Sequence, residues 1–302
     1  MSRLRANFLL LITAFIWGTA FVAQHSGLED VGPFTFTGVR FSLGTLVVMP
    51  LGLREYFRWK QSGGSITMKD WLGMGLCGVF LYTGSVSQQI GLLHTSVTNA
   101  GFFTGLYVPL VPLIMLVFWR KLPHWGIWPA ALGCMVGTYY LSGGNFTTLN
   151  EGDFWVLGGS IFWALQVIVI GFVVKSTQTP VLVAAMQFLT CAVIGMTLAV
   201  HQETMTVSGI IGAGPELLYA GILSIGVAFT LQAVAQRHTP PADAAIIMSG
   251  EILFAALAGA IVLGERLNSA GYVGCVIMFI CILSVELLPL LRSRKKLALE
   301  SS

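Results

Sequence analysis

The chain has 302 residues, of which 55% are hydrophobic and only 10% are charged, and its formal net charge is +3. An average soluble domain carries about 25% charged residues, so this chain lacks the residues for a fully charged surface. The composition excludes an ordinary cytosolic enzyme, a nucleic-acid-binding protein and a disordered protein. It indicates an integral membrane protein instead.

Ten apolar runs follow one another along the chain with short connections between them. A hydrocarbon core of roughly 30 Å is crossed by about 20 residues of helix, and each run has about this length. We therefore predict an all-helical membrane protein with no attached soluble domain. The ten predicted spans lie near residues 6–24, 33–53, 70–92, 96–118, 125–142, 153–174, 180–200, 214–236, 242–263 and 269–291.

The basic residues fall mostly on one side of this predicted topology. Of the 16 lysines and arginines, all lie on the side of the N-terminus except Arg40, inside a span, and Arg266, in a loop on the other side. Loops rich in Lys and Arg are retained in the cytoplasm. We therefore expect the N-terminus and the C-terminus to be cytoplasmic.

The two halves of the chain resemble each other, which predicts one repeat over residues 1–150 and a second over residues 151–302 with a basic cytoplasmic tail. The clearest match has a constant offset of 144 positions and pairs Gln88, His94, Thr95, Asn99 and Ala100 with Gln232, His238, Thr239, Asp243 and Ala244. Each half holds five predicted spans, an odd number. The two repeats must therefore insert into the membrane with opposite orientations.

Inverted repeats of this kind are typical of secondary transporters. Two halves related by an axis in the membrane plane can exchange shapes and open a central site to one side and then to the other. We therefore interpret the chain as a carrier that works by alternating access. The sequence has no GxxxxGK[ST] motif, and its five cysteines lie in apolar runs without metal-binding spacing, so we expect neither ATP hydrolysis nor a metal or cofactor.

Three short motifs are distinctive when they are set in this ten-span pattern. They are Trp17-Gly18 in the first span, the segment from Pro33 to Arg40 in the second, and Gly264-Glu265 after the ninth. The combination resembles the drug/metabolite transporter superfamily, and within it the EamA family. The resemblance implies a carrier of the bacterial inner membrane, usually an exporter of amino acids or related metabolites. It also implies structural roles for Arg40 and for Glu265.

Two tryptophans are candidate substrate-binding residues. Trp17 and Trp163 lie near the middle of their spans, and the repeat pairs them. An indole N–H at this depth needs a hydrogen-bond partner, which favours a cavity over lipid. The alternative is that both residues only pack between helices.

A further stripe of candidates lies on the fourth span, where Asn99, Phe103 and Tyr107 are spaced at i, i+4 and i+8 and should share one helical face. Their counterparts on the ninth span include Asp243 and Glu251. Polar groups at this depth should not face lipid, so we expect the two stripes to line the substrate path. On the third span, Tyr82 adds a further hydroxyl group.

Glu251 is the most informative acid of the sequence. A charge near the middle of a span costs at least about 2.5–3.5 kcal/mol unless it is paired or hydrated. We expect Glu251 to bind substrate or to carry a coupling proton, and Asp243 is a second candidate for proton coupling. The structural alternatives for Glu251 are a hydrogen bond within the bundle or an ion pair with Arg40, and the alternative for Asp243 is capping of a helix.

The family resemblance thus implies a carrier that exports amino acids, and the aromatic residues of the predicted cavity favour substrates with aromatic or apolar side chains. The alternative is a multidrug or other-metabolite carrier working in either direction. An integral-membrane transferase is less favoured, because the acids are scattered and form no catalytic cluster. The expected partners are a small-molecule substrate and the lipid bilayer, without nucleic acid, and a monomer is compatible with the sequence.

Overall fold

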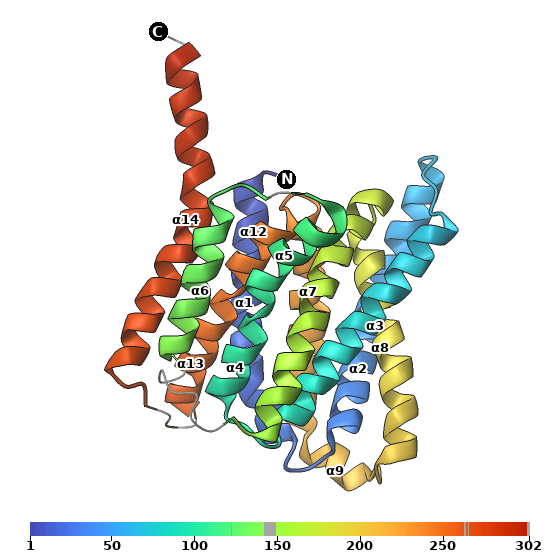
Figure 1. The fold of residues 1–302 in the computed structure, drawn as a ribbon. Coiled ribbons are helices and arrows are strands. Elements are labelled where there is room, and N and C mark those ends of the chain that lie inside the picture. The colour runs from blue at the N-terminus through green and yellow to red at the C-terminus, as the bar shows by residue number, and fades with distance from the viewer. Residues whose placement is uncertain (122, 142–148, 263, 265, 301–302) are drawn as a thin grey trace.

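The structure is a computed structural model that describes residues 1–121, 123–141, 149–262, 264 and 266–300, with side chains as far as residue 285. Glu265, expected as a helix-end contact, lies outside the described residues. The described residues are helical and contain no strand. Figure 1 shows one bundle, with the N-terminus and the C-terminus at the same end.

The helices follow the predicted spans closely, and several spans are divided. In chain order they are α1 (Arg3–Gly27), α2 (Pro33–Gln61), α3 (Met68–Gly91), α4 (Val97–Gly105), α5 (Tyr107–Trp119), α6 (Ile127–Leu141), α7 (Glu151–Thr177), α8 (Pro180–Gln202), α9 (Val207–Gly212), α10 (Gly214–Leu218), the π-helix η1 (Tyr219–Phe229), α11 (Thr230–Gln236), α12 (Pro241–Met248), α13 (Gly250–Val262) and α14 (Ser269–Glu300).

Seven helical stretches among the described residues are long and apolar enough to cross a membrane. They are Arg3–Gly27, Pro33–Gln61, Val97–Trp119, Glu151–Thr177, Pro180–Gln202, Gly214–Gln236 and Pro241–Val262. The helices α3 and α6 occupy two more of the predicted spans but do not meet this standard, and α6 has only 15 residues. The count of ten spans and the cytoplasmic position of the termini therefore remain predictions.

The fourth predicted span is broken between α4 and α5, at Leu106. Pro109 and Pro112 follow within α5. Because proline has no backbone N–H, these two residues cannot donate to the carbonyl groups of Gly105 and Val108. The continuous helical face expected for this span is therefore interrupted.

The matched helices of the two halves run in opposite directions. Glu55, late in α2, accepts hydrogen bonds from the backbone N–H groups of Val181 and Leu182 at the start of α8, at 2.8 and 3.0 Å. Glu203, at the end of α8, accepts one from the N–H group of Thr35 at the start of α2, at 2.8 Å. Helices that cap each other's first turns at both ends are antiparallel, which is the relation that an inverted repeat requires.

The two halves pack against each other along most of their length. Besides α2 with α8, the closely packed pairs are α3 with α7, α6 with α14, and α1 with α13. The contact of α1 with α13 depends on Gly18, because a Cβ atom there would lie 2.6 Å from the carbonyl oxygen of Glu251. Close packing of this kind through small residues is typical of membrane helices. It brings the backbone of Glu251 directly against the first helix.

Candidate functional site

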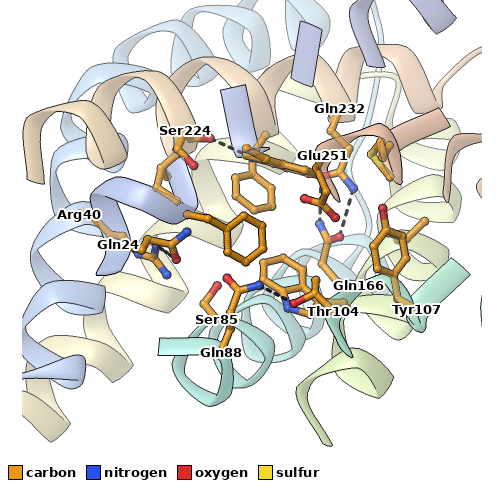
Figure 2. A pocket seen from close by; sticks show the side chains of 17 residues that line it. Gln24, Arg40, Ser85, Gln88, Thr104, Tyr107, Gln166, Ser224, Gln232 and Glu251 are labelled. Atoms are coloured by element: carbon orange, nitrogen blue, oxygen red, sulfur yellow. Dashed lines mark hydrogen bonds between the residues drawn. The ribbon is translucent and has the colours of Figure 1, made fainter. Parts of the chain in front are cut away.

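The candidate site is a narrow cavity between the two halves of the bundle (Figure 2). The volume open to the centre of a water molecule is about 30 Å³, which is room for two or three waters at about 10–15 Å³ each. The conformation is therefore nearly closed around this space. The residues that line it are Trp17, Phe21, Gln24, Arg40, Ser85, Gln88, Thr104, Tyr107, Trp163, Gln166, Val167, Ser224, Ile225, Phe229, Gln232, Met248 and Glu251.

Three aromatic rings form one wall of the cavity. The ring of Phe229, at the end of the π-helix, lies 4.4 Å from that of Trp17 between centroids. The ring of Phe229 also stacks on that of Trp163, with 6.0 Å between centroids and an interplanar angle of 13°. The two tryptophans that the repeat pairs therefore meet through one phenylalanine. Such a surface suits an apolar or aromatic part of a ligand.

The two indole N–H groups have different surroundings. The Trp17 Nε1 donates to the carbonyl oxygen of Ser224 at 3.3 Å, and the Thr13 hydroxyl of the same helix donates to the carbonyl oxygen of Ala228 at 3.1 Å. Both acceptors belong to η1, and π-helical segments are frequent at functional sites. The buried Nε1 of Trp163 has no partner among the described residues. Trp163 therefore retains a donor that a ligand or a water molecule can use.

Side-chain amides supply uncharged hydrogen-bonding groups in the middle of the cavity. Gln166 and Gln232 exchange two hydrogen bonds, at 3.4 and 3.2 Å, and Gln166 also donates to Gln187 at 3.1 Å. Gln88 donates to the hydroxyl of Thr104 at 2.8 Å. Each bond joins two different helices, and all of these residues except Gln187 line the cavity wall.

One end of the cavity carries a positive charge without an acidic partner. The Arg40 side chain, which is 3% exposed, donates to the Gln24 side-chain oxygen. Its guanidinium carbon lies 5.5 Å from the ring centres of Phe36 and Phe41. The Arg40 Nε has no hydrogen-bond partner, and in the described part of the chain no carboxylate lies within 4.0 Å of the guanidinium. Figure 2 shows the Arg40 and Gln24 pair on the side of the cavity away from Glu251.

Another part of the lining carries a carboxyl group without a basic partner within 4.0 Å among the described residues. Glu251 is 5% exposed. The side chain of Tyr107 lies beside it in the cavity wall (Figure 2). The Tyr107 hydroxyl donates a hydrogen bond to the carbonyl oxygen of Ala245 at 3.4 Å. Among the described residues the one ion pair within 4.0 Å joins Arg3 to Asp243. The expected alternative of an ion pair between Glu251 and Arg40 is therefore not formed in this conformation.

The comparisons with known proteins agree with this architecture. The sequence profile of the EamA-like transporter family matches residues 4–143 and again residues 150–286. The chain belongs to the EamA-like transporter family. As a member of this family it is a multi-pass membrane protein that transports small metabolites, and it is not an enzyme.

The individual proteins that are similar to this chain are consistent with its assignment to the EamA-like transporter family. An uncharacterized transporter of Archaeoglobus fulgidus is 29% identical over 95% of this chain and 87% of its own length. A protein of Chlamydia muridarum named S-adenosylmethionine/S-adenosylhomocysteine transporter is 31% identical over 51% of this chain and 47% of its own length. A solved crystal structure at 18% identity superposes with a TM-score of 0.75 over 96% of this chain and 99% of that one, which supports the fold alone.

Four of the predicted substrate-binding residues of this EamA-like transporter lie in the cavity wall, namely Trp17, Tyr107, Trp163 and Glu251. Three others do not. Tyr82 packs between α2 and α8, where its ring approaches Gly195. Asn99 and Phe103 precede the break at Leu106, and Phe103 packs in a separate apolar cluster with Phe21 and Ala255. The break explains why the i, i+4, i+8 stripe does not reach the cavity as one face.

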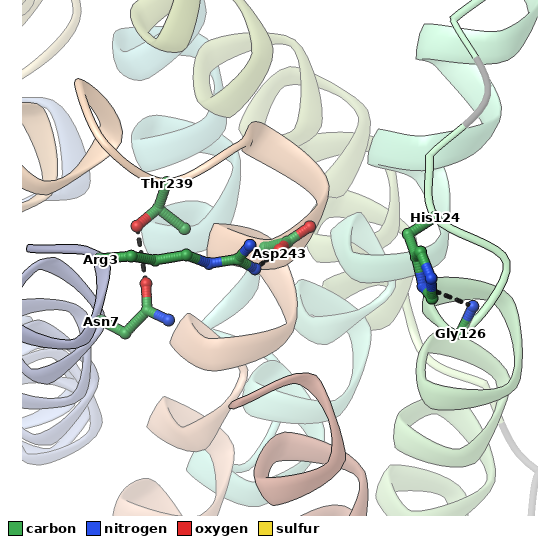
Figure 3. Close-up of polar contacts among 6 residues, drawn as sticks. All are labelled: Arg3, Asn7, His124, Gly126, Thr239 and Asp243. Carbon is green, nitrogen blue, oxygen red and sulfur yellow. Dashed lines mark hydrogen bonds and ion pairs between the residues drawn. The ribbon is translucent and has the colours of Figure 1, made fainter. Parts of the chain in front are cut away.

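Asp243, the second candidate for proton coupling, lies outside the cavity, at the end of the bundle that holds the termini (Figure 3). Its carboxylate pairs with Arg3 on the first turn of α1. Beside it, the Thr239 hydroxyl donates to the side-chain oxygen of Asn7 at 2.6 Å. Both bonds join α1 to the segment around the start of α12. They hold the first helix of one half against the second half at this end.

Several residues of the cavity wall were not singled out by the sequence analysis. They are Phe21, Gln24, Ser85, Thr104, Gln166, Val167, Ser224, Ile225, Phe229 and Met248. The sequence alone could have indicated Gln24 and Gln166, because a side-chain amide inside an apolar run is energetically costly unless it faces protein or a cavity. The sequence could not have indicated Phe229, because a phenylalanine within an apolar span gives the same pattern whether it faces lipid or ligand.

Proposed function

We propose that this transporter carries zwitterionic metabolites, meaning free amino acids or compounds that bear an amino-acid group, across the bacterial inner membrane by alternating access. The observation that carries the proposal is that two buried ionisable side chains, Arg40 and Glu251, line one cavity, and neither has an ion-pair partner within 4.0 Å among the described residues. Burying an isolated charge is costly. A ligand with a carboxylate and an ammonium group supplies both missing partners.

Two further observations support this class of substrate. The aromatic wall of Trp17, Phe229 and Trp163 suits the apolar part of an amino acid. The Chlamydia muridarum relative is named for S-adenosylmethionine, a molecule that carries an α-ammonium and an α-carboxylate group. We propose export as the direction, as the family resemblance implies.

The size of the cavity supports a moving carrier and not an open pore. A space of about 30 Å³ holds only a few waters, so substrate enters after the two halves have separated. The ion pair Arg3–Asp243 and the hydrogen bond between Asn7 and Thr239 join the two halves at the end of the bundle that holds the termini. We propose that these two bonds form a latch that keeps this end closed, and that they break when the cavity opens to this side.

The substrate class is tested by uptake into proteoliposomes that contain the purified protein. Labelled phenylalanine, leucine, methionine and S-adenosylmethionine are offered with and without a pH gradient. We expect saturable uptake of at least one of them, competed by other zwitterions. Phenethylamine, which lacks the carboxylate, and 3-phenylpropionate, which lacks the amine, should compete weakly. Equal competition by either compound, or no uptake of any zwitterion, would contradict the proposal.

Loosening the latch should open the cavity toward the termini. For Asp243→Asn we expect a cysteine introduced at the cavity residue Ser85 to react roughly fivefold faster with an impermeant maleimide added from this side. The factor corresponds to about 1 kcal/mol for a partly exposed ion pair. Glu29→Gln, an exposed carboxylate at the other end of α1, is the matched control and should leave the labelling rate unchanged. Equal rates in both variants would show that the pair does not hold the end closed.

A further inference from the structure

A second hollow shares no lining residue with the transport cavity. It is a groove of about 560 Å³, by the same measure that gives about 30 Å³ for the central cavity. Its walls come from the last turns of α2, the connection between α7 and α8, and the start of α11. It lies at the end of the bundle that holds both termini (Figure 1). The groove therefore spans a contact between the two halves.

The charge of this groove is positive. Arg54 and Arg58 lie one helical turn apart on its wall, and both are exposed. In the described chain neither has a carboxylate within 4.0 Å. The single acid of the lining, Glu55, already accepts hydrogen bonds from the first backbone N–H groups of α8. A third guanidinium, that of Arg237, donates to the lining residue Gln178. The groove thus offers more positive than negative charge, and among the described residues neither Arg54 nor Arg58 is in an ion pair.

The same walls carry polar groups that lack hydrogen-bond partners. Thr179 is fully buried, and its side-chain oxygen has no partner, although the residue stands at the start of α8 where such a hydroxyl normally caps the helix. The indole Nε1 of Trp59 and the hydroxyl of Thr230 are also buried without partners among the described residues. All three residues line the groove. Unpartnered buried donors are rare in native structures, and together they point to an absent acceptor.

The rest of the lining is apolar except for Ser62. Leu51, which is 56% exposed, and Val181 form the part of the groove nearer the middle of the bundle. A ligand that gives partners to all of these groups has two parts. An anionic, hydrogen-bond-accepting head lies beside the arginines, and an apolar chain lies beside Leu51. Basic pockets between membrane helices bind anionic lipid headgroups in this way. We propose that the groove binds an anionic phospholipid, with its phosphate between Arg54, Arg58 and the Thr179 hydroxyl.

The binding of lipid is measured on the purified full-length chain by native mass spectrometry, with phosphatidylglycerol or phosphatidylcholine of the same acyl chains added. We expect phosphatidylglycerol to be retained in preference. Arg54→Gln/Arg58→Gln should weaken its binding roughly 30-fold, from two lost contacts between arginine and an anionic headgroup. Lys60→Gln/Lys69→Gln removes the same charge from exposed positions outside the groove and should leave the affinity within about twofold of wild type.

A second variant tests the unpartnered hydroxyl without changing the charge. Thr179→Val keeps the side-chain shape and should weaken phosphatidylglycerol binding at least about tenfold, as expected for one hydrogen bond to a charged group. Glycerol phosphate without acyl chains is added as a competitor. Equal retention of the two lipids, equal losses in the two double variants, or displacement by millimolar glycerol phosphate would each overturn the lipid assignment. None of these readouts depends on the transported substrate.

Discussion

Glu251→Gln is expected to lower zwitterion uptake by at least about 30-fold while membrane abundance stays unchanged. The estimate follows from the cost of removing one partner of a buried charge pair, at least about 2 kcal/mol. The neutral amide of the variant would fill the same space but could not neutralise a substrate ammonium group. Uptake in proteoliposomes at equal protein content measures the effect.

Stability separates this role from a structural one. In the described structure, the Glu251 carboxyl is buried and has no cationic partner, so its removal should keep or raise the thermal unfolding midpoint in detergent. Glu29→Gln, at an exposed carboxylate, is the control and should change neither uptake nor stability. Wild-type flux in Glu251→Gln, or a loss of flux explained by a lower unfolding midpoint, would remove Glu251 from the site.

The same variant decides whether Glu251 carries the coupling proton. If a pH gradient stimulates the wild-type protein, the variant should lose this stimulation while it still catalyses slow exchange of substrate between the two sides. Exchange needs no net proton movement, so it reports on binding and conformational change alone. Stimulation that persists in the variant would assign the proton to another group.

Arg40→Gln is the second change for which we expect a large effect, again a loss of at least about 30-fold in zwitterion uptake. Arg40→Lys should recover only part of this loss. Lysine restores the charge but not the planar guanidinium group, whose several N–H donors can bind Gln24 and a carboxylate at the same time. Uptake and competition are measured as for Glu251, and Arg5→Gln, at an exposed arginine near the N-terminus, is the control.

The competitor pattern distinguishes substrate binding from the structural role that the family resemblance implies for Arg40. If Arg40 binds the carboxylate, phenylalanine and phenethylamine should compete equally well in Arg40→Gln, because the variant can no longer recognise the carboxylate. If Arg40 only ties α2 to α1 through Gln24, the variant should lose thermal stability and keep the wild-type preference for phenylalanine. The second outcome would contradict the proposed orientation of the substrate.

Much of the fold could be predicted from local sequence properties. Each predicted span contains one helix or several consecutive helices, because a bilayer imposes the length and apolarity of its helices residue by residue. The prediction that the two repeats insert with opposite orientations agrees with the antiparallel packing of α2 and α8. Pro109 and Pro112 indicate a division of the fourth span, because the missing backbone N–H group of proline is a local property that the sequence shows directly.

The cavity could be predicted only in part. Trp17, Trp163, Tyr107 and Glu251 were found because large or polar groups at mid-membrane depth are poorly suited to lipid. Asn99 and Phe103 were placed with Tyr107 on one face by assuming an unbroken helix, and the break at Leu106 removes that assumption. A face can be extrapolated along a helix only as far as the helix keeps its period of 3.6 residues.

The sequence by itself determined the membrane location, the helical class, the repeat and the family, because these depend on composition, on periodicity and on short motifs. Only the tertiary structure decided that Phe229 packs against both tryptophans and that Arg40 and Glu251 line one cavity without ion-pair partners among the described residues. Those relations join residues of both halves that are distant in the chain. They depend on how the two halves pack, and no local pattern encodes that geometry.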